Sequence, residues 1–392
     1  MTSIGLCLIA RNEAAVIGRA LASALPLVDY VLVVDTGSTD GTQDVIKKFL
    51  MERNISGEVI EEPWRDFAFN RTSALRKMRN RKDIDYSLMI DADQIIVFDP
   101  GFDPHRFKAN LSRDIYDVHI RSGAIDYLLP QLVRNTIDIS YKGVLHEYRK
   151  CPKHCTRGSV DGLRIQEMPD GARSRNPRKY ADDALLLEKT LRDETDPFLI
   201  ARYTFYLAQS YRDADELAPA LKFYLRRAEL GFWDEEVFAS LYNAAMIKEK
   251  LGHSFDDVLA SYLRAHESCP RRLEALHGAM RLCRTQQQYA KGYELARGAR
   301  SFRRPKRGLF VETWIYDYGL LDEFSVLAYW TGHYSECLRA CARLLEEQKI
   351  PQDQRERVCQ NAHFAIEKMK APSNCAPMQD RIESGDGRSD GC

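Results

Sequence analysis

Apolar and polar positions in the first part of the chain repeat as a short apolar run, a polar loop and a helical pattern. The run 4–9 is followed by the loop 10–13 and then by apolar residues at helical spacing from Val16 to Ala24. A second run, 30–34, is apolar without interruption, which is typical of strands buried on both faces. Strands that alternate with helices at this spacing predict a mainly parallel sheet, whose ligands bind beyond the carboxyl ends of the strands.

Acidic residues stand at these carboxyl ends. Asp35 follows the second apolar run, and a third run, 86–90, ends in Asp91-Ala92-Asp93. Two carboxylates one residue apart at a strand end can hold a divalent cation, and the cation can neutralise a diphosphate leaving group. Structural alternatives stay open, because Asp35 and Asp40 could cap the following helix and the triplet could form a solvated turn.

The first strand-to-helix turn lacks the glycines of two common nucleotide-binding motifs. A dinucleotide-binding domain requires G-x-G-x-x-G there, and residues 10–18 contain only Gly18. No glycine-rich loop of the sequence ends in Gly-Lys-Ser or Gly-Lys-Thr, the mark of a P-loop. We therefore expect phosphate to be bound through a metal ion, with carboxylates near the base and ribose.

Several motifs, in this order, resemble family 2 glycosyltransferases of the GT-A fold. They are Ala10-Arg11-Asn12-Glu13, the stretch VVDTGSTDGT at 33–42, the stretch W-x-D-F-x-x-N-R at 64–71, Asp91-Ala92-Asp93 and His146-Glu147. The resemblance implies that Glu13 contacts the ribose or base, Asp35 the base, Asp91 the ribose or metal, and Asp93 the metal. It also implies an inverting transfer from a nucleoside-diphosphate sugar, most often a UDP-sugar.

An inverting transfer needs a base that takes the proton of the acceptor and positive charge that stabilises the leaving diphosphate. Glu147 is the first candidate for the base and Asp126 the second. His146 could complete the shell of Mn²⁺ or Mg²⁺ with Asp91 and Asp93, although it could equally be a surface residue.

Three further polar residues are candidates for binding the substrate. Asn70 and Arg71 follow a stretch of core residues, and a guanidinium near a diphosphate can make bidentate contacts. Arg71 could instead be one of the solvated charges that continue through 76–82. Arg134 is a further candidate for contact with phosphate or acceptor.

The pattern becomes almost wholly helical after residue 180, which suggests several domains. We predict a GT-A domain in 1–150, a basic loop or linker in 151–180, helical repeats in 181–370 and a disordered tail in 371–392.

The helical part contains an internal recurrence. Similar segments at 205–211, 240–245 and 275–280 recur about every 34 to 37 residues, each followed by a second amphipathic segment. This period resembles tetratricopeptide (TPR) repeats, which often form a concave surface for peptides. The repeats could equally brace the catalytic domain or form a homodimer. The segment 303–321 interrupts the period.

Composition limits the partners and the location. Lys plus Arg equals 57 and Asp plus Glu equals 57, so the chain is formally neutral, which argues against nucleic-acid binding through a positive field. No apolar stretch is as long as a membrane span and the start does not resemble a secretion signal, so we expect a cytoplasmic protein. The 10 cysteines lack paired spacing, which predicts reduced thiols, and the cluster at 151–155 lacks the second cluster of a zinc site.

Together these features predict a metal-dependent, inverting glycosyltransferase, a hexosyltransferase similar to family 2. Its fold would be an α/β GT-A domain with a mixed, mainly parallel sheet, followed by an all-α TPR-like domain. The acceptor would be a peptide, protein or glycan, as the resemblance to bacterial peptide S-glycosyltransferases and surface-polysaccharide glycosyltransferases implies. The alternative is a non-catalytic TPR adaptor whose nucleotide-sugar-binding domain is degenerate.

Overall fold

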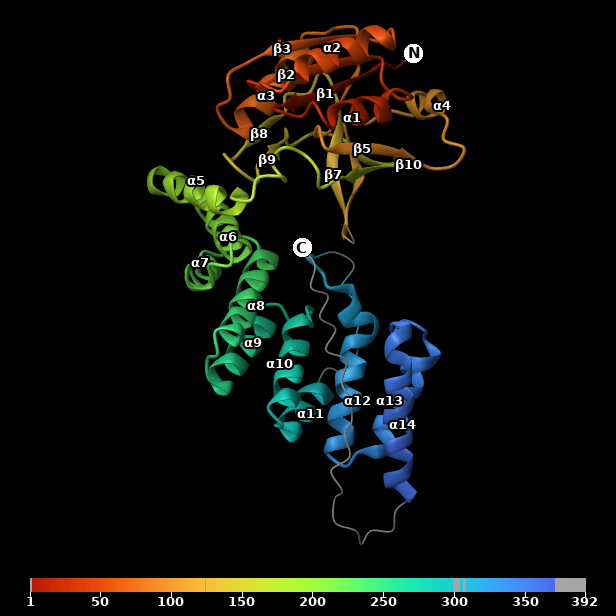
Figure 1. The fold of residues 1–392 in the computed structure, drawn as a ribbon, viewed down its shortest axis with the longest axis vertical. Helices are drawn as coiled ribbons and strands as arrows, with labels where there is room; N and C mark the ends of the chain where they lie inside the picture. The colour runs from red at the N-terminus through yellow and green to blue at the C-terminus, as the bar shows by residue number, and fades with distance from the viewer. Residues whose placement is uncertain (1, 124, 299–303, 306–307, 371–392) are drawn as a thin grey trace. The chain divides into compact units, whose positions relative to one another are not determined.

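The chain divides into two compact units, Met1–Leu199 and Ile200–Cys392 (Figure 1). The structure, a computed structural model, describes residues 2–123, 125–298, 304–305 and 308–370. The tail predicted to be disordered, 371–392, lies outside the described residues.

Unit 1 is built on an eight-stranded mixed sheet. Its strands are β1 (Ile4–Ala10), β2 (Tyr30–Asp35), β3 (Ser56–Glu61), β4 (Tyr86–Met89), β5 (Gln94–Phe98), β6 (Ile115–Ser122), β7 (Ile125–Arg134) and β10 (Arg157–Glu167). They lie in the order β3-β2-β1-β4-β7-β6-β10-β5. The first four strands of that order run parallel, β6 and β10 are also parallel, and β7 and β5 are antiparallel to their neighbours. The predicted fold class of this part, a mixed and mainly parallel sheet, is confirmed.

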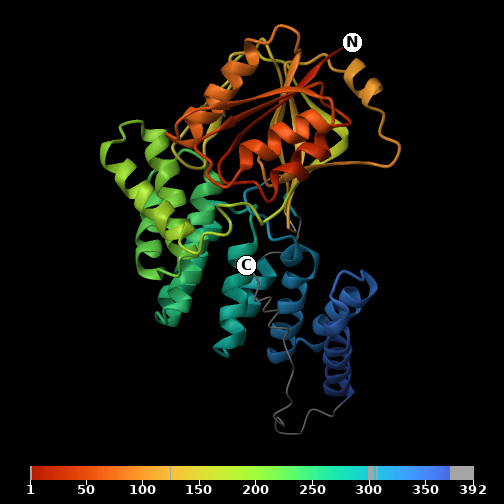
Figure 2. The same ribbon diagram turned by 45° about the horizontal axis from the view of Figure 1, so that its top comes forward.

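Helices cover both faces of the sheet because successive residues of a strand point to opposite faces. Leu6 and Leu8 of β1 pack on one side in a core that includes α1 and α2, drawn in red and orange in Figure 2. Cys7, between them, packs on the other side in a core that includes α3. The helices of unit 1 are α1 (Ile17–Ala24), α2 (Thr42–Glu52), α3 (Phe67–Arg79), α4 (Pro104–Ala109) and α5 (Lys179–Asp193).

The segment predicted to be a basic loop or linker, 151–180, differs from that prediction in its middle. Its residues 157–167 form β10, which lies inside the sheet between β6 and β5. Val160 and Ile165 of this strand are buried in the core. A register shift in the pairing with β6, together with the left-handed backbone of Gly162, interrupts the alternation of apolar and polar residues. Because of this interruption, the pattern of the sequence did not predict the strand.

A two-stranded antiparallel sheet lies beside α3. It consists of β8 (Ser140–Lys142) and β9 (Tyr148–Lys150). The amide of Tyr141 in β8 donates a hydrogen bond to Oγ1 of Thr72 in α3, at 2.8 Å. The loop between the two strands therefore starts close to this helix, and it carries His146 and Glu147.

Unit 2 is helical, as predicted. Its helices are α6 (Pro197–Asp213), which begins in unit 1, α7 (Leu217–Glu229), α8 (Asp234–Lys250), α9 (Phe255–Ser268), α10 (Glu274–Thr285), α11 (Tyr289–Gly298), α12 (Leu320–Trp330), α13 (Tyr334–Glu346) and α14 (Arg355–Lys370). From α7 onward each helix contacts the next along the chain, as in a repeat protein (Figure 1). The recurring segments of the sequence lie in α6, α8 and α10, and a small residue of each is buried: Ala208, Ala244 and Ala279.

Among the residues that the structure describes, no helix is both long enough and apolar enough to span a membrane.

Candidate active site

The strands β1, β2 and β4 end side by side at one edge of the sheet. Ala10, the last residue of β1, pairs with Asp35, the last residue of β2, and β4 runs parallel on the other side of β1. The loops that leave these strands carry Glu13 and the triplet 91–93. The structure therefore gathers the predicted carboxylates at the edge where ligands of parallel sheets bind.

Asp35 is fully buried, and only one of its two carboxylate oxygens accepts hydrogen bonds. Its Oδ1 accepts hydrogen bonds from the amides of Gly37 and Ser38 at 3.1 and 2.9 Å and from Nε2 of Gln43 at 3.1 Å. Its Oδ2 is buried and has no hydrogen-bond partner among the residues that the structure describes. A buried acceptor without a donor costs about 1 to 3 kcal/mol, so this oxygen suits an N–H donor of a ligand. The side chain does not cap α2, whose N-cap residue is Gly41.

Glu13 is held by a segment that crosses the same edge. Its Oε2 accepts a hydrogen bond from the amide of Ala172 at 3.0 Å. Burial raises the pKa of Glu13, and the negative charge of Asp93 adds to this effect. The crossing segment, residues 168–175, directly follows β10, and Asp170 within it forms an ion pair with Arg19 at 2.7 Å. The sequence left open whether the basic stretch that contains this segment borders the active site or is a solvated connector.

Gly171 allows the crossing segment to touch the carboxylate of Asp93. A Cβ atom at residue 171 would lie 2.6 Å from Oδ2 of Asp93, closer than van der Waals contact permits. We expect Gly171→Val to displace the segment and to weaken binding of UDP, measured by calorimetry, at least tenfold. Gly18→Ala is the matched control, because a Cβ atom there meets nothing within 4 Å and should leave UDP binding unchanged. Equal affinities for both variants would contradict the contact.

Arg71 in α3 joins two of the predicted site carboxylates. Its Nη2 lies 2.6 Å from Oδ1 of Asp91, and its Nε lies 2.8 Å from Oε1 of Glu147. Burial opposes the charge of this guanidinium, but Asp91 and Glu147 raise its pKa above the ordinary value. Arg71 was predicted to contact a diphosphate, whereas in this structure its guanidinium is engaged by carboxylates. It thereby ties the strand end at β4 to the loop between β8 and β9.

Asp93 has an excess of negative charge around it. Burial raises its pKa to about 6, and the carboxylates of Asp91, Glu167 and Asp170 contribute to this increase. A cation placed beside Asp93 would lower the energy of this arrangement. The two carboxylates of the triplet therefore fit a divalent cation whose remaining ligands come from a diphosphate or water.

The complete metal shell predicted from the sequence is not assembled. In the part of the chain that the structure describes, no three His, Cys, Asp or Glu side chains are placed to hold a metal ion. His146 is exposed, and its backbone has the left-handed φ of 51°. The structure therefore does not bring His146 together with Asp91 and Asp93 as a third ligand.

Two other predicted binding residues have contacts that stabilise the fold. Asn70 is fully buried, and its amide nitrogen donates to Oε2 of Glu62 at 3.0 Å and to the carbonyl of Pro63 at 3.1 Å. Arg134 pairs with Tyr86, the first residue of β4, so it lies at the opposite edge of the sheet from Asp91. Its Nη2 donates to the carbonyl of Ser112 at 3.0 Å. The contacts of Arg134 therefore lie away from the carboxylate edge. Asn70 supports that edge indirectly, because the amide of its partner Glu62 donates to the carbonyl of Asp35 at 2.9 Å.

Asp126, the second candidate for the base, lies on the hairpin that β6 and β7 form. Its two carboxylate oxygens accept hydrogen bonds from Arg121 across the hairpin at 2.9 and 3.0 Å. The hydrogen bonds from this guanidinium lower the pKa of Asp126. Because Glu147 shares Arg71 with Asp91 and Asp126 does not, the geometry favours Glu147.

The fold defines the class of this part of the chain: an α/β domain whose acidic residues gather at the carboxyl edge of its sheet. Residues 6–100 match the family model described as Glycosyl transferase family 2. The chain therefore carries a family 2 glycosyltransferase domain, as predicted, and this domain is followed by a TPR-like helical unit.

Three curated proteins illustrate what the chain resembles. An uncharacterized glycosyltransferase of Rickettsia felis is 35% identical over 94 residues, which is 24% of this chain and 30% of the relative. One from Rickettsia prowazekii is 34% identical over 94 residues, 24% of this chain and 29% of the relative. A TPR repeat-containing protein of Synechococcus elongatus is 27% identical over 156 residues, 38% of this chain and 35% of the relative. The chain spans about a third of the length of the curated relatives it matches.

Solved structures resemble the chain only distantly. S. aureus TarS 1-349 in complex with UDP-GlcNAc has a TM-score of 0.36 and 13% identity, over 68% of this chain and 91% of that chain. A tetratricopeptide repeat protein from Parabacteroides merdae has a TM-score of 0.35 and 18% identity, over 49% of this chain and 67% of that chain.

Proposed function

We propose that this protein is an inverting, metal-dependent glycosyltransferase that moves a sugar from a UDP-sugar to a peptide, protein or glycan acceptor. The donor would bind at the carboxyl edge of the sheet. Glu13 and Asp35 would contact the nucleoside, and the triplet 91–93 would lie beside the diphosphate.

The free oxygen of Asp35 is the observation that carries this proposal. Oδ1 is saturated by the turn that follows β2, so Oδ2 alone is available to a ligand. Uracil presents a ring N–H that a carboxylate oxygen can accept, and a buried hydrogen bond to a charged acceptor contributes about 1.5 to 3 kcal/mol. The family match over the same strands supports a nucleotide sugar as the ligand.

The residues around Arg71 have separate tasks in the proposed reaction. Arg71 would hold Glu147 and Asp91 in place through its two ion pairs. Glu147 would accept the proton of the acceptor nucleophile while that nucleophile attacks the anomeric carbon. The bond between that carbon and the diphosphate oxygen breaks in the same step, and the electron pair leaves with UDP.

A divalent cation would be held by Asp93 and Asp91, and it would supply positive charge to the departing diphosphate. The charge of Arg71 is already paired with protein carboxylates, because both of its ion pairs are to Asp91 and Glu147. Mn²⁺ or Mg²⁺ suits an all-oxygen ligand set of this kind.

Asp35→Asn tests the proposal with little change to the fold. The remaining amide oxygen can keep the bonds from Gly37 and Ser38, which places an NH₂ group where Oδ2 now lies. That group would oppose the N–H of the base, so we expect UDP affinity, measured by calorimetry, to fall about 30- to 100-fold.

Asp83→Asn serves as the control for this measurement. It also removes one negative charge, but Asp83 precedes β4 at the other edge of the sheet and pairs there with Arg81 at 2.9 Å. Its UDP affinity should equal that of the wild type. If Asp35→Asn binds UDP as tightly as Asp83→Asn does, the base does not reach Asp35 and the proposed donor site is wrong.

A further inference from the structure

One buried glutamine closes the turn that carries the two carboxylates of the triplet 91–93. The chain turns back between Asp91 and Gln94, where the amide of Gln94 donates to the carbonyl of Asp91 at 3.0 Å. The side chain closes the turn a second time, because its Oε1 accepts a hydrogen bond from the amide of Asp91 at 2.9 Å. Both backbone polar groups of Asp91 are therefore bound by a single residue that has no task in the proposed reaction so far.

The amide nitrogen of the same glutamine is directed to another carboxylate. Nε2 of Gln94 lies 3.5 Å from Oε1 of Glu167, a long hydrogen bond, and this oxygen also accepts a hydrogen bond from the hydroxyl of Tyr127 at 2.8 Å. Glu167 ends β10 and pairs with Gln94, which begins β5. Because a primary amide carries its acceptor and its donors on different atoms, the nitrogen toward Glu167 leaves the oxygen facing Asp91. The end of β10 thus fixes the orientation of the side chain.

The triplet is held by three separate contacts. Gln94 binds the backbone of Asp91, and Arg71 lies 2.6 Å from the carboxylate of Asp91. The carbonyl of Asp93 accepts a hydrogen bond from the amide of Met168 at 3.0 Å. Ligands of a metal ion must be held within about 0.5 Å of their working positions by the residues behind them. The spacing of the two carboxylates therefore depends on the turn that Gln94 closes.

The side chain that closes this turn is neutral, although its surroundings are acidic. Burial raises the pKa of Asp93, and the charges of Asp91, Glu167 and Asp170 add to this effect. A carboxylate at residue 94 would increase the repulsion whenever no cation is bound. An apolar side chain there would leave the amide of Asp91 without its acceptor. Glutamine accepts the hydrogen bond and adds no charge.

We propose that Gln94 is a positioning residue for the divalent cation that accompanies UDP. By accepting the hydrogen bond from the amide of Asp91, it spaces the carboxylates of Asp91 and Asp93 so that both can bind one Mn²⁺ or Mg²⁺ ion. The inference rests on the proposed function, and it adds a residue that contacts neither the cation nor the substrate. A purely structural role would be different, because loss of the hydrogen bond would then lower stability and leave metal binding unchanged.

The coupling between Mn²⁺ and UDP separates these two roles. Calorimetry measures the affinity for UDP with Mn²⁺ and with EDTA, and the ratio of the two affinities is the gain from the metal. We expect a gain of at least about tenfold in the wild type and of less than about threefold in Gln94→Met, which has a side chain of similar length without the acceptor. With EDTA the two proteins should bind UDP within about twofold of each other. Thermal unfolding verifies that Gln94→Met is folded.

Gln94→Glu is the conservative variant. Glutamate keeps an acceptor for the amide of Asp91 and adds negative charge near the cation, so the gain from Mn²⁺ should be at least that of the wild type.

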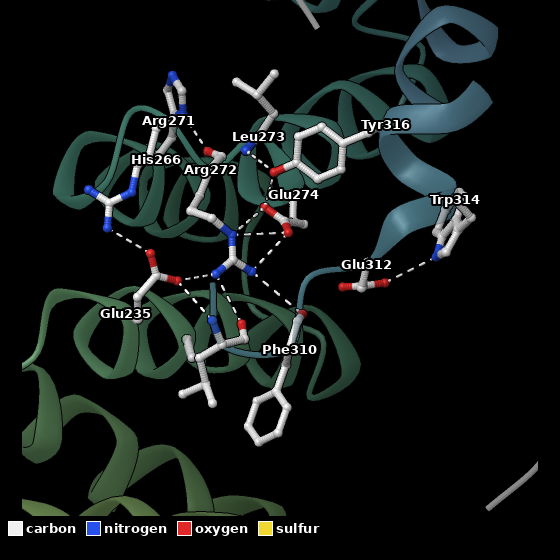
Figure 3. Close-up of polar contacts among 12 residues, drawn as sticks. Glu235, His266, Arg271, Arg272, Leu273, Glu274, Phe310, Glu312, Trp314 and Tyr316 are labelled. Atoms are coloured by element: carbon white, nitrogen blue, oxygen red, sulfur yellow. Dashed lines mark hydrogen bonds and ion pairs between the residues drawn. The ribbon is translucent and has the colours of Figure 1, made fainter. Parts of the chain in front are cut away.

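Tyr316→Phe is the matched control for the loss of a buried acceptor. In unit 2 the hydroxyl oxygen of Tyr316 accepts a hydrogen bond from the amide of Leu273 at 2.9 Å, and the hydroxyl donates to Glu274 at 2.6 Å (Figure 3). The variant removes these contacts without adding volume, so it should unfold at a lower temperature. Its gain from Mn²⁺ should equal that of the wild type.

The possible failures are distinguishable. A gain from Mn²⁺ that Gln94→Met retains, or a loss of the gain that Gln94→Glu or Tyr316→Phe shares, would overturn the positioning role while the proposed donor site stands. No gain in the wild type would contradict the proposed metal dependence itself, and with it this inference.

Discussion

Asp93→Asn is expected to reduce the turnover of sugar transfer by about a thousandfold while the protein remains folded. The substitution keeps the size of the side chain, so Gly171 can still pack against it, but it removes the charge that would hold the cation beside the diphosphate. Thermal unfolding of Asp93→Asn beside the wild type tests whether the variant is folded. Release of UDP from several UDP-sugars in the presence of Mn²⁺ measures the turnover.

Asp99→Asn is the control for this loss of charge. Asp99 follows β5 and lies 3.5 Å from Arg164, without a contact to the triplet at 91–93. Its variant should release UDP at the wild-type rate. If the wild type releases UDP and Asp93→Asn does so equally fast, a cation at Asp93 is not part of the reaction. If neither the wild type nor any variant releases UDP from any donor, a non-catalytic TPR adaptor becomes the better interpretation of the protein.

Replacement of Arg71 by methionine is expected to lower the free energy of unfolding by about 3 kcal/mol and to abolish transfer. Methionine can fill much of the same volume, but Asp91 and Glu147 would then face each other without the guanidinium that joins them. Urea unfolding measures the stability. The loss of activity follows because the proposed base would no longer be held in position.

A double variant separates the loss of charge balance from the loss of packing. If the two ion pairs account for the effect, Arg71→Met with Glu147→Gln should be more stable than Arg71→Met alone, because one unpaired carboxylate is removed. Both variants should remain inactive. A single variant as stable as the wild type would contradict the role of Arg71 as the link between α3, β4 and the loop before β9.

The sequence predicted the part of the site that is local to strand ends. Asp35 and the triplet 91–93 directly follow apolar runs, and Glu13 lies in the short loop after another run, so the position of each could be inferred from the strand before it. The structure places them at one edge because these strands are parallel neighbours. The roles assigned to them stay predictions until the variants are measured.

Other features of the site depend on long-range packing that the sequence does not encode locally. Arg71 and Glu147 are 76 positions apart, and Ala172 reaches Glu13 from 159 positions away. Arg134 was a candidate for contact with phosphate or acceptor, but antiparallel pairing with the start of β4 directs it to the other edge. The direction of a strand cannot be read from its own composition.

In unit 2 the sequence predicted the helices and also the interruption at 303–321. Each helix has its own apolar periodicity, so the class of structure followed from local pattern. The contacts of the interrupting segment could not be predicted, because Arg272 and Glu235 that hold it belong to two earlier helical regions.

A crystal structure of the protein with UDP and Mn²⁺ would test the central claim most directly. The account predicts the uracil ring N–H within hydrogen-bond distance of Oδ2 of Asp35 and the diphosphate beside Asp91 and Asp93. UDP bound at another surface, or an empty carboxyl edge at saturating UDP, would contradict it.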